Sequence, residues 1–402
     1  MYICCLLSLP SHPKNQKGPR YNRTVIEEHL LKLGALLMMA RPPVQLHFDK
    51  FLTDVHPQFN VTDVMFRLTP TCTSILERCS WRGRQVPCDT LFATRVTPLG
   101  FCCVFNSRYY PVDANNQPHV LDLIGHNLGL GVVITENKDD FKYVRRNSNG
   151  AEMLLFEGSE YPLLESGDVR LYPVPRNNSL HFNIKVITQY AHDDIKLFSE
   201  KYRGCRTEGA GMSQCLAACQ SATAAAICSC VPYTLHAALN HDERRVCSLR
   251  DVYCLNKHRE KFLYLFPPTA DKDDPQISEE LQNGIDCPKC LVLCKRQVYW
   301  ARVSYVQHNG GAGIFRNFLT EGLRLINSTT IRMFYASDHY ERFALEPYVR
   351  WYEVLAILST EWMALAGTSV VVILEVVYYF TFRWIHHFIR RKRLGDLRSH
   401  SM

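Results

Sequence analysis

The sequence predicts an α+β membrane protein: a large, disulfide-rich ectodomain of mixed β-sheet with a cysteine-rich helical insert, followed by one C-terminal transmembrane helix. Three observations predict this class. Residues 362–380 form an apolar run, a basic tail follows directly, and all seventeen cysteines lie upstream of the run. The chain before the run is long enough to bury a substantial core.

The apolar run has the length of a membrane span. Its nineteen residues would rise roughly 28 Å as an α-helix, against a hydrocarbon core of about 30 Å. The run includes Gly367, Thr368, Ser369 and Glu375, and a carboxylate in a bilayer is costly unless it faces water or a partner. Two interpretations of Glu375 stay open: a structural helix contact or snorkelling residue, or a helix that faces a bundle or an aqueous path.

The tail sets the orientation. Six basic residues and one acid, Asp396, give it +5 of the formal net charge of +7 and leave the preceding residues at +2. The positive-inside rule places such a tail in the cytoplasm. The basic balance therefore indicates topology and contact with the lipid bilayer, and it indicates no nucleic-acid partner.

The upstream residues have the features of an extracellular region. Cysteine clustering fits an oxidising compartment. Four asparagines begin Asn-x-Ser/Thr sequons and are candidate glycosylation sites: Asn22, Asn60, Asn177 and Asn327. No signal peptide opens the chain, because the first apolar residues lack a basic leader and end at Pro10. Either the C-terminal span does its own targeting or the true N-terminus is missing.

Local patterns predict the elements of the ectodomain. Helical spacing over Tyr21–Met39 predicts a surface helix, and prolines with scattered aromatics predict loops over residues 41–70. Turn clusters and alternating side chains predict five strands, at Leu130–Thr135, Val169–Val174, His181–Tyr190, Gln297–Gln307 and Thr329–Ala336.

Ten of the cysteines fall between Cys205 and Cys294. With helix-like spacing over Gln214–Ala226, they predict two antiparallel helices stapled by disulfides. Zinc is the alternative, because Cys287-x2-Cys290 has the spacing of a zinc knuckle. Outside the cell disulfides are favoured, and each would contribute roughly 2–4 kcal/mol.

Four stretches share one order and spacing with a known family. They are Cys79-Ser-Trp-Arg-Gly-x4-Cys88 with the following Phe92 and Gly100-Phe-Cys102-x2-Phe105-Asn106, the ten-cysteine insert, Gly367-Thr368-Ser369, and Glu375 six residues after that serine. Together they resemble the degenerin/epithelial sodium channel family, most closely its insect pickpocket branch, over residues 2–383.

The resemblance implies that the chain functions as a subunit of a trimeric, amiloride-sensitive sodium or cation channel. This channel would lie in the plasma membrane and be gated through its ectodomain. The subunits would form a homo- or heterotrimer and need no cofactor besides permeant Na⁺. Gly367, Thr368 and Ser369 would form the selectivity filter, and Ala356 would occupy the gating position. Glu361 near the outer mouth would either attract cations or be a solvated interfacial acid.

The family pattern also implies domains. Residues 1–355 would form the ectodomain, 356–382 the pore-lining helix and 383–402 the cytoplasmic tail. Within the ectodomain, residues 1–103 would belong to the finger and palm, 104–200 to the β-rich palm and β-ball, 201–296 to the helical thumb and 297–355 to the palm return strands.

The same pattern implies the disulfides. They are Cys205–Cys294, Cys215–Cys290, Cys219–Cys287, Cys228–Cys254, Cys230–Cys247, Cys79–Cys88, and Cys102 with the first ectodomain cysteine, for which Cys4 is the candidate. Cys5, Cys72 and Cys103 are left over, and the last two could pair.

Other features depart from the family. If Cys4 is the first ectodomain cysteine, we expect the first span to be missing. Ser359, Thr360 and Met363 stand where the family has glycines, which reduces backbone freedom. Two alternatives stay open: a single-span receptor, and a non-conducting or regulatory channel subunit. An enzyme is not expected, because the chain has no His-Glu-x-x-His and Gly367-Thr-Ser lacks the second glycine of a nucleophile elbow. The extracellular ligand or tether cannot be inferred from the residues.

Overall fold

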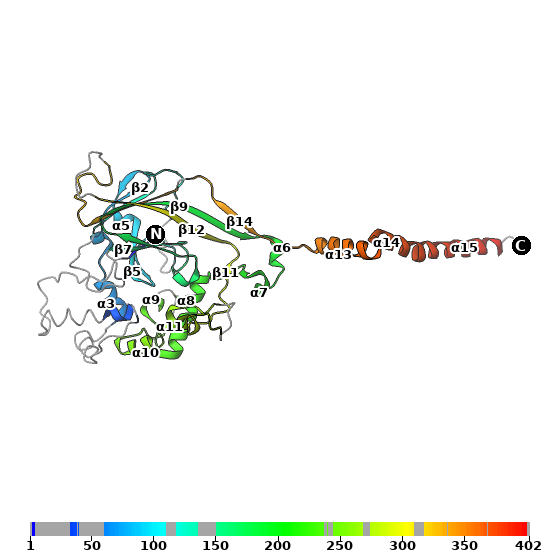
Figure 1. Ribbon diagram of the computed structural model, residues 1–402, viewed down its shortest axis with the longest axis horizontal. Helices are drawn as coiled ribbons and strands as arrows, with labels where there is room; N and C mark the ends of the chain where they lie inside the picture. Colours follow the sequence, from blue (N-terminus) through cyan, green and yellow to red (C-terminus); the bar gives the residue numbers. More distant parts are fainter. Residues whose placement is uncertain are drawn as a thin grey trace. The chain divides into compact units, whose positions relative to one another are not determined.

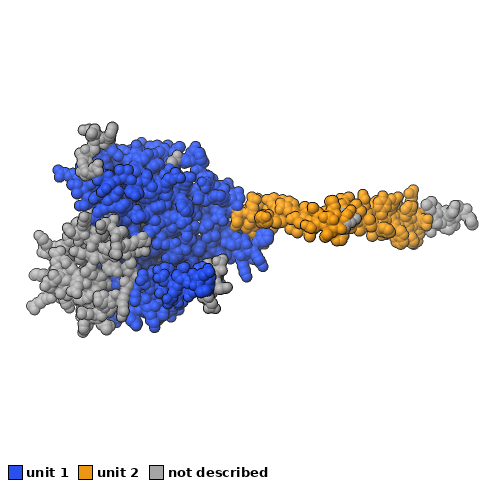
Figure 2. Space-filling view, in the orientation of Figure 1, with its two compact units in different colours: residues 1–191, 198–344 blue, residues 192–197, 345–402 orange. Residues whose placement is uncertain are grey.

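The computed structural model describes residues 2–4, 33–37, 39, 60–109, 118–135, 150–236, 239, 244–267, 274–308, 317–335, 337–367 and 369–399. Two compact units make up the chain (Figure 2). The first comprises residues 1–191 and 198–344, and the second comprises residues 192–197 and 345–402. Among the described residues, the first unit holds two large β-sheets, a two-stranded sheet and a cysteine-rich helical region, and the second is helical (Figure 1).

The larger sheet has seven strands in the order β12-β9-β13-β6-β2-β3, with β14 paired to β9. Their bounds are β2 Leu76–Trp81, β3 Arg84–Val86, β6 Leu130–Thr135, β9 Asn178–Ala191, β12 Arg296–Gln307, β13 Ser328–Tyr335 and β14 Glu341–Leu345. The long β9 pairs antiparallel with the whole of β12, from Asn178 to Gln189, and parallel with β13. The ladder between β9 and β12 lies at one edge of the sheet.

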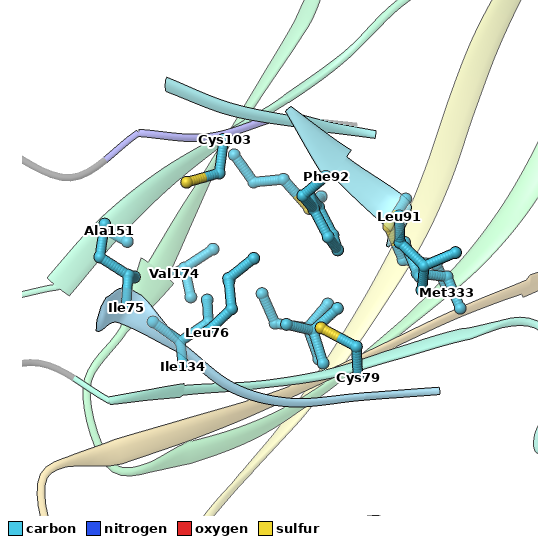
Figure 3. Packing of buried hydrophobic residues seen from close by; sticks show 14 of the residues in the cluster. Ile75, Leu76, Cys79, Leu91, Phe92, Cys103, Ile134, Ala151, Val174 and Met333 are labelled. Atoms are coloured by element: carbon cyan, nitrogen blue, oxygen red, sulfur yellow. The ribbon is translucent and has the colours of Figure 1, made fainter. Parts of the chain in front are cut away.

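The smaller sheet has the order β4-β5-β1-β7-β8. Its strands are β1 Tyr2–Cys4, β4 Phe92–Thr97, β5 Gly100–Phe105, β7 Gly150–Leu155 and β8 Arg170–Pro175. Side chains from both sheets form one core, in which Phe92, Ala151 and Val174 face Leu76 and Ile134 (Figure 3). Each large apolar side chain buried there contributes about 1.5–3 kcal/mol.

The helical region is built around α8, Met212–Cys228, which lies beside the shorter helices on one side of the sheets (Figure 1). Alanine is the commonest residue of α8 and favours a helix, and its small alanine, serine and cysteine side chains add little bulk. Its buried side contacts two cores along its length: Leu216 and Ala217 pack into one, and Ala224 and Cys228, nearer its C-terminus, pack into the other. The shorter elements nearby are α7 Glu200–Arg203, β10 Cys205–Arg206, α9 Tyr233–His236, η3 Leu249–Asp251, α10 Val252–Lys257, α11 Arg259–Leu263, α12 Glu279–Gln282 and β11 Val292–Leu293.

The predicted pair of antiparallel helices is present only in part. One long helix is present, and the returning chain is divided into α10 and α11, which meet at His258. The cysteines that staple α8 from the other side, Cys287 and Cys290, lie in a turn. Disulfide spacing alone does not require both partners to be helical.

The predicted loop over residues 41–70 is wrong where the structure describes it. Helix α3, Val61–Leu68, begins at Asn60, whose side chain accepts a hydrogen bond of 2.9 Å from the N–H of Thr62. Buried Val61, Met65 and Leu68 recur at helical spacing. An asparagine at the N-cap position followed by this helical spacing predicts the start of a helix. The sequence analysis considered Asn60 only as a candidate glycosylation site and so missed the helix.

All five predicted strands are present, and β6 matches to the residue. The sequence patterns missed the other strands of both sheets, among them β2 to β5, β7 and β14. Strand β3 has only three residues, and β5 is buried along almost its whole length, which removes the alternation. Short helices also went unpredicted: α4 Cys72–Ile75, α5 Cys88–Leu91 and η2 Leu164–Ser166. Of the predicted helix Tyr21–Met39, residues 33–37 are helical and most of the others lie outside the described residues.

Candidate functional site

The second unit contains the predicted filter residues. After the short helix α6, Asp193–Lys196, it consists of α13 Trp351–Ala366, α14 Val370–Tyr378, the π-helix η4 Tyr379–Arg383 and α15 Trp384–Ser399. At the start of α13 the N–H of Arg350 donates to Oε2 of Glu353 at 3.0 Å. The prediction of one helix over residues 362–380 is wrong, because a break separates α13 from α14.

Two residues make the break. Gly367 has φ +62°, and its N–H donates to the carbonyl of Met363 at 3.0 Å. A glycine in this left-handed conformation ends a helix at no steric cost. Ser369 then caps α14, because its Oγ accepts the N–H of Val372 at 3.3 Å. Thr368 lies outside the described residues.

The break changes what the backbone can bind. The last carbonyls of α13 and the first amides of α14 have no partners within their own helices. The carbonyl end of α13 carries the negative end of its helix dipole. The carbonyl end of α13 therefore lies directly before the small-residue triplet that the sequence predicts as a filter. Within the part of the chain that the structure describes, no single helix combines the length and apolar character needed to cross a membrane.

The other predicted pore residues flank the break. Ala356 and Glu361 are on α13, and Glu375 is on α14, all exposed. The Oγ1 of Thr360 donates to the carbonyl of Ala356 at 2.8 Å. Helix α13 continues through Ser359, Thr360 and Met363 without interruption, as expected where side chains replace glycines.

Apolar side chains cover much of the second unit. Trp351 is 75% exposed, Leu365 87% and Phe380 77%. Such a surface is larger than monomeric soluble proteins usually expose, and it marks contact with lipid or with other chains.

The thumb cysteines form a nested set of disulfides with the same pairs that the resemblance implied: Cys205–Cys294, Cys215–Cys290, Cys219–Cys287, Cys228–Cys254 and Cys230–Cys247. Cys215 and Cys219 lie one turn apart on α8, so the two bridges to the 287–290 turn fix that helix at successive turns. Because Cys287 and Cys290 are both consumed in these bridges, neither is available as a zinc ligand.

The remaining described cysteines belong to the sheet region. Cys72 bonds to Cys103 and Cys79 to Cys88. Cys102 is disulfide-bonded as well. Strand β1, which ends at Cys4, pairs with β5 so that Ile3 is opposite Cys103. The side chain of Cys4 and all of Cys5 lie outside the described residues, so Cys4–Cys102 stays a prediction.

Three of the four sequon asparagines are described, and their glycosylation stays a prediction. Asn60 is exposed at the start of α3, while Asn177 and Asn327 are half-buried in turns with positive φ. Asn22 lies outside the described residues.

Sequence reasoning missed an acidic group at the start of α8. The helix begins after Gly211, and a Cβ on that glycine would lie 2.0 Å from Oε1 of Glu160. Burial, followed by the charges of Glu157 and Asp168, raises the pKa of Glu160 to about 7, against the opposing effect of hydrogen bonding to Ser213. No sequence pattern brings residue 160 to this helix, because the contact depends on tertiary packing.

Glu160 predicts a pH dependence of stability. Its folded-state pKa exceeds the usual 4.5, so the stabilising proton is bound in the folded chain at low pH and is lost as pH rises to about 7. We expect Glu160→Gln to raise the Tm of the full chain at pH 8 by a few degrees, with about 1–2 kcal/mol gained after discounting for partial exposure. The gain should disappear below pH 5.

Thermal unfolding in a pH series measures this effect. Glu280→Gln, on the exposed surface of α12, is the matched control. Parallel curves for Glu160→Gln and wild type at every pH would contradict the assignment.

Comparison with known proteins identifies the class and then the family. Residues 11–379 match the profile of a protein family described as "Amiloride-sensitive sodium channel". The chain is thus a homologue of ion channels, a class distinct from enzymes. It belongs to the amiloride-sensitive sodium channel family, which confirms the resemblance drawn from its motifs.

Insect proteins are among the relatives. The chain is 22% identical over 333 residues to sodium channel protein Nach of Drosophila virilis, and the aligned region covers 80% of each of the two chains. It is 22% identical over 338 residues to Pickpocket protein 11 of Drosophila melanogaster, covering 81% of this chain and 57% of that protein. Nach of D. melanogaster is 19% identical, with 77% of this chain and 58% of that protein covered.

Proposed function

We propose that the chain is a subunit of a trimeric, amiloride-sensitive sodium or cation channel of the plasma membrane. Its ectodomain would be extracellular and its basic tail cytoplasmic. The observation that carries this proposal is the helix break at Gly367 and Ser369, in a chain of the sodium channel family. The break places the carbonyl end of α13 and the Ser369 hydroxyl within a segment of exposed apolar side chains.

Permeation would use the break. Three copies of Gly367, Thr368 and Ser369 would offer carbonyl and hydroxyl oxygens to a partly dehydrated Na⁺. The negative end of the α13 dipole would favour a cation at this point. The apolar side chains of α13 and α14 would face lipid or neighbouring subunits, and the polar triplet would face the water-filled axis.

Gating would pass through two adjacent strands. Strands β9 and β14 pair with each other, and each continues along the chain into the second unit. Within that unit the N–H of His192 donates to the carbonyl of Leu345 at 3.0 Å. A displacement of the disulfide-stapled ectodomain would therefore reach α13 through two hydrogen-bonded chain segments.

Two measurements test the proposal. The full-length transcript product, recorded by two-electrode voltage clamp, should carry an inward current that amiloride blocks and sodium replacement removes. Single cysteines placed along residues 362–380 should react with hydrophilic thiol reagents on one helical face. Uniform protection of these positions in assembled protein would exclude an aqueous pathway, and a reactive face without current would favour a non-conducting subunit.

Substitution of Ala356 provides a gating test. A bulky side chain at this position on α13 should hold the channel open, because close packing of three helices there requires a small residue. We expect Ala356→Phe to increase the resting amiloride-sensitive current severalfold. Ala356→Ser, which keeps the side chain at this position small, is the control. A resting current of Ala356→Phe equal to that of the wild type would reject the gating role.

A further inference from the structure

The face of the larger sheet opposite the core carries a cavity. Phe182, Ile184 and Tyr299 point into the core on one side of β9 and β12. On the opposite side, Ile187, Val298 and Trp300 line a cavity of about 400 Å³. Side chains alternate along a strand, which places these two sets on different faces. The volume lies within the range of small-molecule sites.

One charged pair in this cavity is already neutralised. The Nη1 of Arg296 donates to both carboxylate oxygens of Asp168, at 2.8 and 3.1 Å, and its Nε donates to Oε1 of Gln189 at 3.0 Å. Arg296 is therefore held by its neighbours and forms part of the wall. Asp168 is correspondingly unavailable to a cationic ligand.

Arg170, the second arginine that lines the cavity, stacks on an aromatic ring. The guanidinium carbon of Arg170 lies 4.2 Å from the ring centroid of Trp300, and its Nε is buried without a hydrogen-bond partner. Among the residues that the structure describes, the Arg170 guanidinium has no ion-pair partner. A buried donor without an acceptor costs free energy. Stacking on the indole holds the guanidinium in place, so a positioned cation lines the cavity.

We propose that this cavity binds a small apolar carboxylate. The charged lining groups are Asp168, Arg170 and Arg296, which leaves one excess positive charge. A carboxylate would accept hydrogen bonds from Arg170 in the bidentate geometry that guanidinium groups favour. The apolar body of the ligand would lie against Ile187, Val298 and Phe343. A cationic ligand would face the unneutralised arginine and is excluded.

Binding to the purified full chain tests the proposal without depending on conduction. The probe is 2-naphthoate, and the matched control ligand is 2-naphthamide, which has nearly the same shape and no charge. By isothermal titration calorimetry, the acid should bind at least about tenfold more tightly than the amide, because a charge-assisted hydrogen bond contributes more than a neutral one. Equal affinities, or no binding of the acid, would overturn the proposal.

Variants assign the binding to this cavity. Arg170→Gln should weaken 2-naphthoate binding about tenfold and leave the amide unchanged. Trp300→Leu removes the stacking surface but keeps the charge, and it should weaken both ligands. Arg302→Gln is the control, since Arg302 lies on the same face of β12 two residues beyond Trp300, is exposed and does not line the cavity. Unchanged acid affinity in both Arg170→Gln and Trp300→Leu would place the binding elsewhere.

Discussion

Replacing Gly367 by alanine should reduce the amiloride-sensitive current about 5- to 30-fold. The residue has φ +62°, a conformation that costs an L-residue roughly 1–2 kcal/mol, and that energy corresponds to such a population change. Alanine is also the strongest helix former, so α13 would tend to continue through the break. The carbonyls proposed to bind the ion would then return to helix hydrogen bonds.

The control for this substitution is Gly322→Ala. Gly322 has φ +76° and, like Gly367, has open space where a Cβ would be. It carries the same kind of backbone strain in the ectodomain, far along the sequence from the break. Surface biotinylation should show similar expression for both variants, with the current reduced in Gly367→Ala alone. If the two variants carried equal currents, the proposal that residue 367 belongs to the selectivity filter would be rejected.

Removing the outermost thumb disulfide should produce a substantial loss of stability. The double variant Cys205→Ser/Cys294→Ser opens a bridge with a sequence separation of 89. Because Cys215–Cys290 remains closed inside it, the loop released is only about 15 residues, and we expect a loss of about 3 kcal/mol. This corresponds to a decrease in Tm of about 5 °C.

Thermal unfolding of the full chain without reductant measures the loss. Both cysteines are replaced, since a single replacement would leave a free thiol that could form wrong bridges. Cys79→Ser/Cys88→Ser, which opens a separation of 9 in the sheet region, provides a comparison. Limited proteolysis should detect new cleavage between residues 206 and 214 only in the thumb variant. An unchanged Tm with no new cleavage would contradict the expectation.

The sequence predicted those features that local pattern or family spacing determines. The alternation in β9 and β12 located the ladder that these two strands form, and the motif Gly-Thr-Ser located the filter candidate. The helix break itself could have been predicted, because glycine followed by an N-cap serine is an end signal and a start signal together. The long apolar run instead led to the prediction of one continuous helix, because hydropathy depends on composition and contains no information on backbone conformation.

Other features depend on long-range packing that no local pattern contains. Glu160 meets Gly211 at the start of α8, and Arg170 of β8 meets Trp300 of β12. These contacts arise because segments far apart in the sequence are folded together, so the residues look unremarkable in the sequence. The group with the raised pKa and the positioned arginine were therefore both missed.

The nesting of the thumb bridges also determines the order in which the chain can be completed during synthesis. Cys205, Cys215 and Cys219 must all wait for partners at positions 287 to 294, which ribosomes deliver roughly 5–20 s later at ordinary rates of elongation. During that interval three reactive thiols are exposed together with the earlier cysteines. Maturation of this chain should therefore depend on a disulfide isomerase.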